Sequence, residues 1–310
     1  MKLLLTGCFK YSENQLEVIK DLGYEITLVQ NELQKLDIDV QEFEVVVCNS
    51  LFVHNDLNDF KNLKAVQLTS AGLDRFPVDK MDLKRVKVAN AKGVYSIPIA
   101  EWVVLKILEL YKGSLAFIHN QQNKVWEKKR ELLELNGQTA CIVGAGSIGT
   151  EIAKRLQVFG VTTIGVDISS QPKEYFDEMY LIQELKQCIN RCDTVILTVP
   201  LTETTYRMIN QEILRCMKNT AVVVNVARGE IINEQDLIEA LRNKTIAGAI
   251  LDVFEQEPLR EESPLWEMEN VIVTPHNSFV STRNKERLYQ LILENLKAIK
   301  EGNKLVNQVR

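Results

Sequence analysis

The sequence lacks the features that mark membrane, secreted and nucleic-acid-binding proteins. It contains no stretch of about 18 uncharged apolar residues, the length that a membrane-spanning helix needs. Only three apolar residues, Leu3–Leu5, stand near the N-terminus before polar residues resume, too few for a secretory signal. The 37 basic and 42 acidic residues leave a net charge of −5, which attracts neither phosphate backbones nor anionic lipid strongly. We therefore expect a cytoplasmic protein that binds neither nucleic acid nor membranes.

Cysteine and histidine are also scarce. Six cysteines in 310 residues do not make a disulfide framework, and we interpret them as reduced thiols. Cys188 and Cys192 are four residues apart in a helical pattern, but no further cysteines or histidines lie near them to complete a metal site. His54 and His119 have no chemical context, so we expect surface or structural roles for both. The sequence predicts no metal site.

What the sequence does contain is an alternation of short β-branched runs with helix-length amphipathic stretches, the pattern of parallel sheets covered by helices. The first series of predicted strands is Lys2–Thr6, Glu25–Val29, Val45–Cys48, Ala65–Leu68 and Val86–Ala89. The second series is Ala140–Val143, Thr163–Val166, Thr194–Val199, Ala221–Val226, Ala247–Leu251 and Val271–Thr274. A helix beginning at Ser96-Ile97-Pro98 separates them, and another is predicted over Arg287–Lys300. We expect an α/β protein of two domains.

A glycine-rich turn joins the predicted strand at Ala140–Val143 to a helical pattern. The segment Gly144-Ala145-Gly146-Ser147-Ile148-Gly149 has the spacing of a dinucleotide-binding turn. In such a turn the first glycine permits a tight bend, the second lets a pyrophosphate approach the backbone, and the third allows close helix–strand packing. The helix N-terminus then favours the anion. The context of strand, glycine turn and helix therefore predicts a bound dinucleotide.

Asp167 indicates which dinucleotide this is. It ends the next predicted strand, 18 residues after Gly149, where a carboxylate can accept hydrogen bonds from the adenosine ribose. A carboxylate repels a 2′-phosphate, and none of Ile168, Ser169 and Ser170 supplies a compensating cation. We therefore expect NAD, as NADH, rather than NADP.

Three residues suited to keto-acid chemistry follow the later strands, at the ends where open α/β sheets bind ligands. They are Arg228, Glu257 and His276. Arg228 can hold a carboxylate by two hydrogen bonds, and His276 can protonate a ketone oxygen. Glu257 can orient the imidazole and favour its charged form. The set suits the reduction of a 2-keto acid.

Taken in order, these motifs resemble the D-isomer-specific 2-hydroxyacid dehydrogenase family, over essentially the whole chain. The matching segments are Gly144 to Gly149, Asp167, Ala227-Arg228-Gly229, Leu251 to Pro258 and Thr274-Pro275-His276. The resemblance implies two doubly wound parallel-sheet domains. A Rossmann dinucleotide-binding domain, residues 98–279, would be inserted in a flavodoxin-like substrate-binding domain made of residues 1–97 and 280–310. It also implies an NAD-dependent oxidoreductase that interconverts a small 2-keto acid and a D-2-hydroxy acid, and a homodimer.

The resemblance further assigns individual site residues. The catalytic triad would be Arg228, Glu257 and His276. The residues expected to bind the cofactor are Gly144, Gly146, Ser147, Ile148, Gly149, Asp167, Pro200, Val226, Ala227 and Asp252. Pro200 would lie beside the adenine and Asp252 on the nicotinamide carboxamide. The residues expected to bind the substrate are Ser70, Ala71, Gly72, Asn49, Ser50 and Tyr95. The amides of the first three would bind the substrate carboxylate.

The sequence departs from the family pattern at two places. Asn277-Ser278-Phe279 follows the histidine where the family usually carries a small, glycine-containing pair, and Ser147 stands where arginine is frequent. The first departure bears on the shape of the substrate pocket, and the second is expected to weaken one phosphate contact without changing the reaction. Formate-oxidising relatives pair the histidine with glutamine, whereas Glu257 here supports a proton-donating histidine and hence keto-acid reduction.

The substrate's side chain is expected to meet the loop Asn49–Val53 together with Tyr95. These residues are apolar or weakly polar, and no lysine or arginine follows in this loop before Lys61. A phosphorylated substrate would need cations there. We therefore expect an unphosphorylated keto acid that is small or has an apolar side chain.

Two other functions are compatible with a dinucleotide-binding fold. A dehydrogenase with a Tyr-x-x-x-Lys dyad is excluded, because none of the eight tyrosines has a lysine four residues later. A dinucleotide-sensing binding protein or corepressor with the same fold stays open, because the resemblance extends to such proteins and the triad alone does not separate them.

Overall fold

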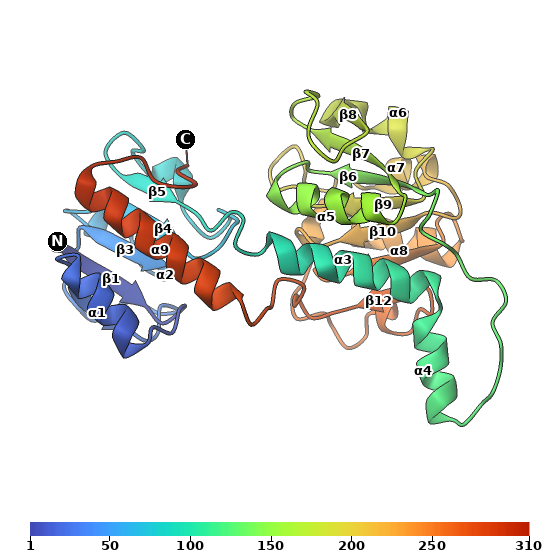
Figure 1. Cartoon of the computed structure of the whole chain (residues 1–310), viewed down its shortest axis with the longest axis horizontal. Helices are drawn as coiled ribbons and strands as arrows, with labels where there is room; N and C mark the ends of the chain where they lie inside the picture. The colour runs from blue at the N-terminus through green and yellow to red at the C-terminus, as the bar shows by residue number, and fades with distance from the viewer. Residues whose placement is uncertain (310) are drawn as a thin grey trace. The chain divides into compact units, whose positions relative to one another are not determined.

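The computed structural model describes residues 1–309, which form two compact units. Unit 1 consists of residues 1–95 and 281–309, and unit 2 is the continuous segment Ser96–Val280 (Figure 1). The chain thus leaves unit 1 once, completes unit 2, and returns. Within residues 1–309 no helix is long and apolar enough to cross a membrane.

Unit 1 is built on a five-stranded parallel sheet with the order β2-β1-β3-β4-β5. Its strands are β1 (Lys2–Thr6), β2 (Glu25–Val29), β3 (Val45–Cys48), β4 (Ala65–Leu68) and β5 (Lys87–Ala89). Four of the five have the predicted bounds, and β5 begins one residue later than expected. This strand order is that of flavodoxin-like sheets.

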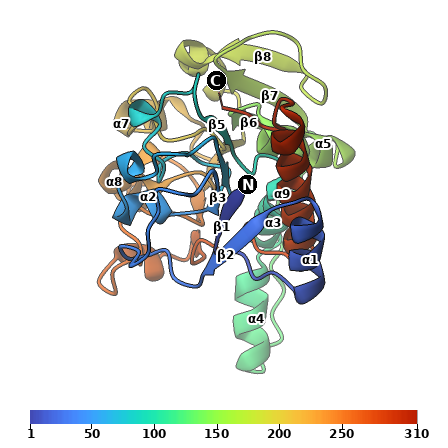
Figure 2. The same cartoon turned by 90° about the vertical axis from the view of Figure 1, so that its left-hand side faces the viewer.

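Helices cover both faces of this sheet. Figure 2 shows α1 (Glu13–Asp21) and α9 (Asn284–Glu301) on one side and α2 (Leu51–His54) on the other. Strand side chains alternate between the two faces. Leu3 and Leu5 therefore pack with Ile292 of α9, whereas Leu4 packs with Phe52 of α2. Short 3₁₀ helices lie at Leu57–Asp59 and Val78–Lys80. The last helix of the chain completes the core of unit 1.

Unit 2 is built on a seven-stranded parallel sheet with the order β12-β11-β10-β9-β6-β7-β8. Its strands are β6 (Thr139–Val143), β7 (Thr162–Asp167), β8 (Glu178–Leu181), β9 (Thr194–Leu197), β10 (Val222–Asn225), β11 (Gly248–Leu251) and β12 (Val271–Val273). The strand order reverses between β6 and β9, which is where doubly wound sheets bind dinucleotides. The predicted fold class, two parallel-sheet α/β units, is confirmed.

The helices of unit 2 lie in two layers. Figures 1 and 2 show α3 (Ser96–Tyr111) and α5 (Ser147–Val158) together on one face of the sheet. The other face packs against α6 (Leu185–Ile189), α7 (Gln211–Cys216) and α8 (Glu234–Arg242). Three 3₁₀ helices, Ile182–Glu184, Gly229–Ile231 and Pro264–Trp266, lie in the connections. The remaining helix, α4 (Ser114–Gln122), projects away from the sheet (Figure 1).

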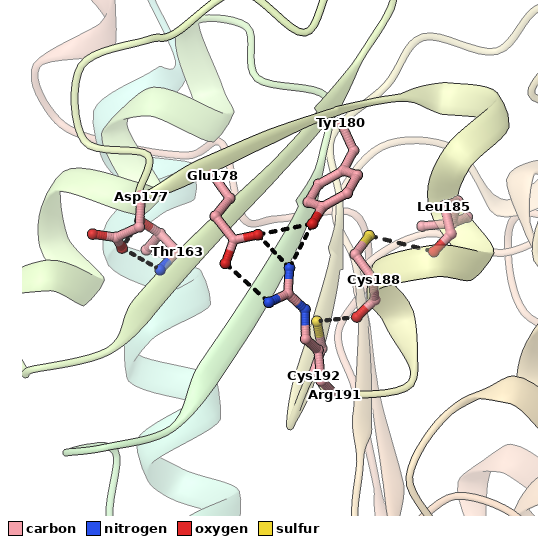
Figure 3. Close-up of polar contacts among 8 residues, drawn as sticks. All are labelled: Thr163, Asp177, Glu178, Tyr180, Leu185, Cys188, Arg191 and Cys192. Carbon is pink, nitrogen blue, oxygen red and sulfur yellow. Dashed lines mark hydrogen bonds and ion pairs between the residues drawn. The ribbon is translucent and has the colours of Figure 1, made fainter.

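The sequence did not predict β8, which lies at the edge of this sheet. Figure 3 shows the polar contacts that hold the edge. The carboxylate of Asp177, just before β8, accepts hydrogen bonds from the Thr163 amide (2.7 Å) and hydroxyl (3.0 Å) of β7. The Arg191 guanidinium pairs with the Glu178 carboxylate, holds the pKa of that carboxyl below its usual value, and donates to the Tyr180 hydroxyl (2.8 Å). β8 is therefore held by polar contacts and lacks the apolar run from which the other strands could be predicted.

The cysteines are free thiols, and five of them are at least partly buried. Cys188 of α6 donates a hydrogen bond to the Leu185 carbonyl (3.3 Å), and Cys192, beyond the end of α6, donates to the Cys188 carbonyl (3.1 Å). Cys8 alone is exposed. Across residues 1–309 no group of three or more histidine, cysteine or acidic side chains is arranged to hold a metal ion.

Candidate active site

The glycine turn of unit 2 has the geometry of a phosphate cradle. Gly144 lies in the left-handed region (φ +104°), and its amide donates to the Val166 carbonyl (2.7 Å). A Cβ on Gly149 would lie 2.1 Å from the Gly144 oxygen, so close packing forbids any side chain there. A Cβ on Gly146 would meet no atom within 4 Å. The middle glycine therefore faces open space, and the turn fits a pyrophosphate.

The helix that follows this turn begins without a side-chain cap. Gly146 is the N-cap of α5, so the first amides of the helix, including those of Ser147 and Ile148, have no capping side chain. The Ser147 hydroxyl is hydrogen-bonded to the Ser96 hydroxyl at the start of α3 (3.1 Å). A twelve-residue helix with open N-terminal amides favours an anion at this end.

Asp167, at the end of β7, is paired with a lysine that sequence reasoning missed. Its Oδ1 accepts a hydrogen bond from the Ile168 amide (2.7 Å), and its Oδ2 lies 2.9 Å from Lys173 Nζ. Lys173 Nζ also donates to the Ala145 carbonyl of the glycine turn (2.8 Å). The three residues that follow Asp167 supply no cation, as stated from the sequence, but the chain turns back so that Lys173, the sixth residue after Asp167, reaches the carboxylate.

The other predicted cofactor residues lie at the carboxyl ends of β9 and β10. Pro200 follows β9 on the surface, and its carbonyl accepts a hydrogen bond from the Thr205 hydroxyl (2.6 Å). Val226 and Ala227 follow β10 and are buried. Because β9 borders the point where the strand order reverses and β10 is the next strand along, these residues stand at the edge where such sheets bind ligands.

Arg228 is held at the end of β10 by its own loop. The Asn225 side-chain amide donates to the Arg228 carbonyl (2.9 Å). A Cβ on Gly229 would lie 1.8 Å from the Phe254 carbonyl carbon, so the backbone after Arg228 packs directly against the loop after β11. The half-buried Arg228 is therefore fixed beside the loop that carries Glu257.

Glu257 and His276 form a hydrogen-bonded pair. Glu257 Oε2 lies 2.8 Å from His276 Nδ1. The Phe254 amide donates to the other carboxylate oxygen (3.2 Å). Burial of this carboxyl acts to raise its pKa, but the hydrogen bond and charge of His276, the Phe254 amide and the Arg228 charge outweigh burial and hold the pKa below the ordinary glutamate value. The carboxylate fixes Nδ1 as the donor and leaves Nε2 for chemistry.

The backbone at His276 is constrained as well. It has a positive φ of 50°, which is uncommon for a residue with a side chain, and its amide donates to the Asp252 carbonyl (2.8 Å). Asp252 itself is fully buried. Its carboxylate accepts hydrogen bonds from the Thr274 hydroxyl and from the amides of Asn277 (2.8 Å) and Ser278 (2.9 Å). Asp252 thus anchors the loop on both sides of His276, and its predicted contact with the nicotinamide carboxamide stays a prediction.

Phe279, the bulkiest part of the departure from the family pattern, stands beside His276. The two rings meet edge to face, with centroids 6.0 Å apart and an interplanar angle of 89°. The Phe279 side chain is partly exposed. The departure therefore places an aromatic ring next to the proposed proton donor. By contrast, Glu255, two residues before Glu257, pairs with Arg207 (3.2 Å) and is therefore a salt-bridged side chain.

The predicted substrate residues of unit 1 lie in the loops after β3 and β4, except Tyr95, which lies between β5 and α3. Within residues 1–309 the amides of Ser70, Ala71 and Gly72 donate to no protein acceptor. The Tyr95 hydroxyl donates to the Thr69 carbonyl (2.6 Å), and burial raises the pKa of Tyr95 to about 12. Tyr95 is therefore a stable donor that holds this loop, and three amides are left open for an anion.

A buried carboxylate that the sequence did not single out holds the other loop. Glu32 is only 6% exposed, and it accepts hydrogen bonds from the amides of Asn49 (3.1 Å) and Ser50 (2.7 Å) and from the Thr6 hydroxyl (2.6 Å). Leu51 and Phe52, which follow in this loop, were expected to meet the substrate's side chain. They instead pack into the core of unit 1 and so do not line a pocket. Glu32 belongs to no motif, and only the fold brings it to this loop.

Comparison with known proteins identifies the family. The model of the D-isomer specific 2-hydroxyacid dehydrogenase NAD binding domain matches residues 104–278, within unit 2. A glyoxylate reductase of Thermofilum pendens is 34% identical over 247 residues, 78% of this chain and 73% of that protein. An (S)-sulfolactate dehydrogenase of Chromohalobacter salexigens is 31% identical over 279 residues, 88% of this chain and 90% of that protein.

A solved structure is similar over the whole chain. The D-isomer specific 2-hydroxyacid dehydrogenase of Xanthobacter autotrophicus Py2, in complex with NADPH and MES, matches 100% of this chain and 98% of that one, with a TM-score of 0.83 and 26% identity. The chain belongs to the D-isomer specific 2-hydroxyacid dehydrogenase family. The predicted family and activity class, an oxidoreductase of 2-hydroxy acids with a nicotinamide dinucleotide cofactor, are confirmed.

Proposed function

We propose that the protein reduces a small, unphosphorylated 2-keto acid to the D-2-hydroxy acid with NADH, and that Arg228, Glu257 and His276 catalyse the reaction. The observation that carries this proposal is the Glu257–His276 hydrogen bond of 2.8 Å beside the Arg228 loop. An imidazolium whose Nδ1–H is held by a carboxylate can give the proton on its other nitrogen to a substrate oxygen. The reduced nicotinamide, when bound, supplies the hydride for the carbonyl carbon.

Each residue of the triad has a separate part in the proposed mechanism. His276 Nε2 gives its proton to the carbonyl oxygen, which becomes the hydroxyl of the product. Glu257 keeps the ring oriented and stabilises the charge that His276 carries before the transfer. Arg228 holds the substrate anion with two parallel hydrogen bonds, which the planar guanidinium favours. Asp252 keeps the loop of His276 in place through the Asn277 and Ser278 amides.

We propose further that unit 2 binds the dinucleotide and unit 1 the substrate. The glycine turn and the open amides of α5 support a pyrophosphate at Gly146, with the ribose at Asp167. The open amides of the Ser70–Gly72 loop support an anion in unit 1. Asn49 and Ser50 stand in the neighbouring loop that Glu32 holds. The related glyoxylate reductases support a keto acid with a small side chain.

A steady-state assay of NADH oxidation tests the proposal. We expect turnover with glyoxylate, pyruvate or hydroxypyruvate and much lower kcat/KM with phosphohydroxypyruvate. A preference for the phosphorylated compound would overturn the substrate class. Tight NADH binding without turnover on any keto acid would support the alternative, a dinucleotide-sensing binding protein.

We propose that the protein is a homodimer and that α4 and the loop after it form the interface. None of the nine residues of α4 is fully buried, and a helix this short is marginal in water without packing. Phe117 and Ile118 of α4 and Trp126 of the following loop are exposed, Trp126 to 96%. A second copy of the chain would cover this apolar arm. The free thiols support a reducing compartment such as the cytoplasm.

A further inference from the structure

A lysine stands where the proposed cofactor site meets the adenosine ribose. Lys173 lies between β7 and β8, and its Nζ is 2.9 Å from Asp167 Oδ2 and 2.8 Å from the Ala145 carbonyl oxygen. The side chains of Lys173 and Asp167 are 37% and 20% exposed. The mechanism of keto-acid reduction makes no use of this lysine.

The two contacts link the end of β7 to the glycine turn. Asp167 is fixed from its other side by the Ile168 amide (2.7 Å), so the carboxylate stays in place while the lysine side chain, with its flexible stem, is the mobile partner. A carboxylate alone repels a 2′-phosphate. The Lys173 ammonium cancels the charge of the Asp167 carboxylate, so the pair adds no net charge to the site. The ammonium also has a third hydrogen to donate.

We infer that Lys173 makes the ribose end of this site accept a 2′-phosphate, so that the enzyme uses NADPH as well as NADH. The inference rests on the proposed dinucleotide site. With NADH, Lys173 stays on Asp167 and the carboxylate receives the ribose hydroxyls. With NADPH, the ammonium turns to the phosphate while it keeps its place over the Ala145 carbonyl. Lys173 is thus a specificity-determining residue rather than a catalytic one.

The test is the affinity of the full-length enzyme for each cofactor, measured by fluorescence titration with NADH and with NADPH. For the wild type we expect dissociation constants within about tenfold of each other. For Lys173→Met we expect the ratio of the NADPH constant to the NADH constant to rise by about tenfold or more, the effect of one lost charge-assisted hydrogen bond. Lys173→Arg, which keeps the cation, should stay near the wild-type ratio.

Lys218→Met is the matched control. Lys218 pairs with Asp193 of the same unit at 2.7 Å, with side-chain exposures of 36% and 18%, close to those of the Lys173 pair. For Lys218→Met we expect the ratio of the NADPH dissociation constant to the NADH dissociation constant to equal that of the wild type. A ratio that does not change in Lys173→Met would overturn the inference, as would wild-type binding of NADPH that is a hundredfold weaker than that of NADH. Failure to bind either nucleotide would instead refute the proposed function.

Discussion

His276 carries the proposed proton transfer, and its removal is the most direct test of the mechanism. The change His276→Asn keeps a polar side chain but removes the acid, so kcat should fall by about two to four orders of magnitude. The dissociation constant of NADH should stay near the wild-type value. Steady-state kinetics and NADH fluorescence titration measure the two quantities. His119→Asn, on the exposed helix α4, is the control and should leave kcat unchanged. Near-normal turnover of His276→Asn would refute the assignment.

Arg228 tests whether charge alone is enough to hold the substrate. Lysine keeps the charge but is a point cation without the planar pair of donors, so Arg228→Lys should raise KM for the keto acid and lower kcat together. Because Gly229 and Asn225 fix the backbone on either side of the loop, the fold should tolerate the change. NADH affinity should be retained. If the variant loses NADH binding instead, Arg228 serves the cofactor or the structure.

The depressed pKa of Glu257 sets a pH window for stability. A carboxyl whose pKa is lower in the folded chain than in the unfolded chain stabilises the fold above its unfolded value, about 4.3 for glutamate, and this contribution is lost as the pH falls through the folded value. The free energy of unfolding of Glu257→Gln should therefore be below that of the wild type at pH 5, and the gap should shrink toward pH 3. Urea denaturation at both pH values measures the gap. An equal gap at both would show that the carboxylate's charge is not the cause.

Among the connections between elements, the loop after β3 depends on a single carboxylate. In Glu32→Gln an NH₂ group replaces one oxygen, so one of the donors that Glu32 now satisfies is left unpaired in a buried place. We expect the free energy of unfolding to fall by about 1–3 kcal/mol. KM for the keto acid should rise while the NADH dissociation constant stays unchanged, which a merely structural residue would not produce.

The control for this loop is Glu44→Gln in the same unit. Glu44 also accepts a backbone hydrogen bond, from the Lys2 amide (3.1 Å), and pairs with Lys64, but it contacts neither Asn49 nor Ser50. The Glu44→Gln variant should leave KM for the keto acid unchanged. An equal rise in KM for both variants would show that general loss of stability, and not the loop, is responsible.

The elements also show which features of a chain can be predicted from its sequence. Most of the strands were located by their apolar runs, because a strand buried on both faces needs such a run. β8 was missed because it lies at an edge, where Glu178 and Tyr180 are held by Arg191 rather than by apolar packing. The glycine turn and the triad residues stand in motifs with fixed spacing and could be named in advance. Lys173 and Glu32 could not, since only the folded chain brings them to Asp167 and Asn49.

For the molecule as a whole, the apolar arm at α4 predicts the oligomeric state. Trp126→Ser removes the largest exposed apolar side chain of the arm, and we expect it to convert a dimer into a monomer, since aromatic anchors dominate such interfaces. Light scattering coupled to size-exclusion chromatography gives the mass. Trp266→Ser, at another exposed tryptophan of unit 2, is the control and should leave the dimer intact. A wild-type monomer would refute the proposed interface.

The order of the units along the chain has a consequence for synthesis. A ribosome builds the chain from its N-terminus, so unit 2 has all seven strands of its sheet once Val280 has been added. Unit 1 has its five strands long before, but the core on one face lacks Leu288, Ile292 and Leu296, which α9 supplies last. Until then α1 alone covers this face of the nascent sheet, and part of its apolar surface stays exposed while the inserted unit is made. The earlier part of the chain is thus the last to finish folding.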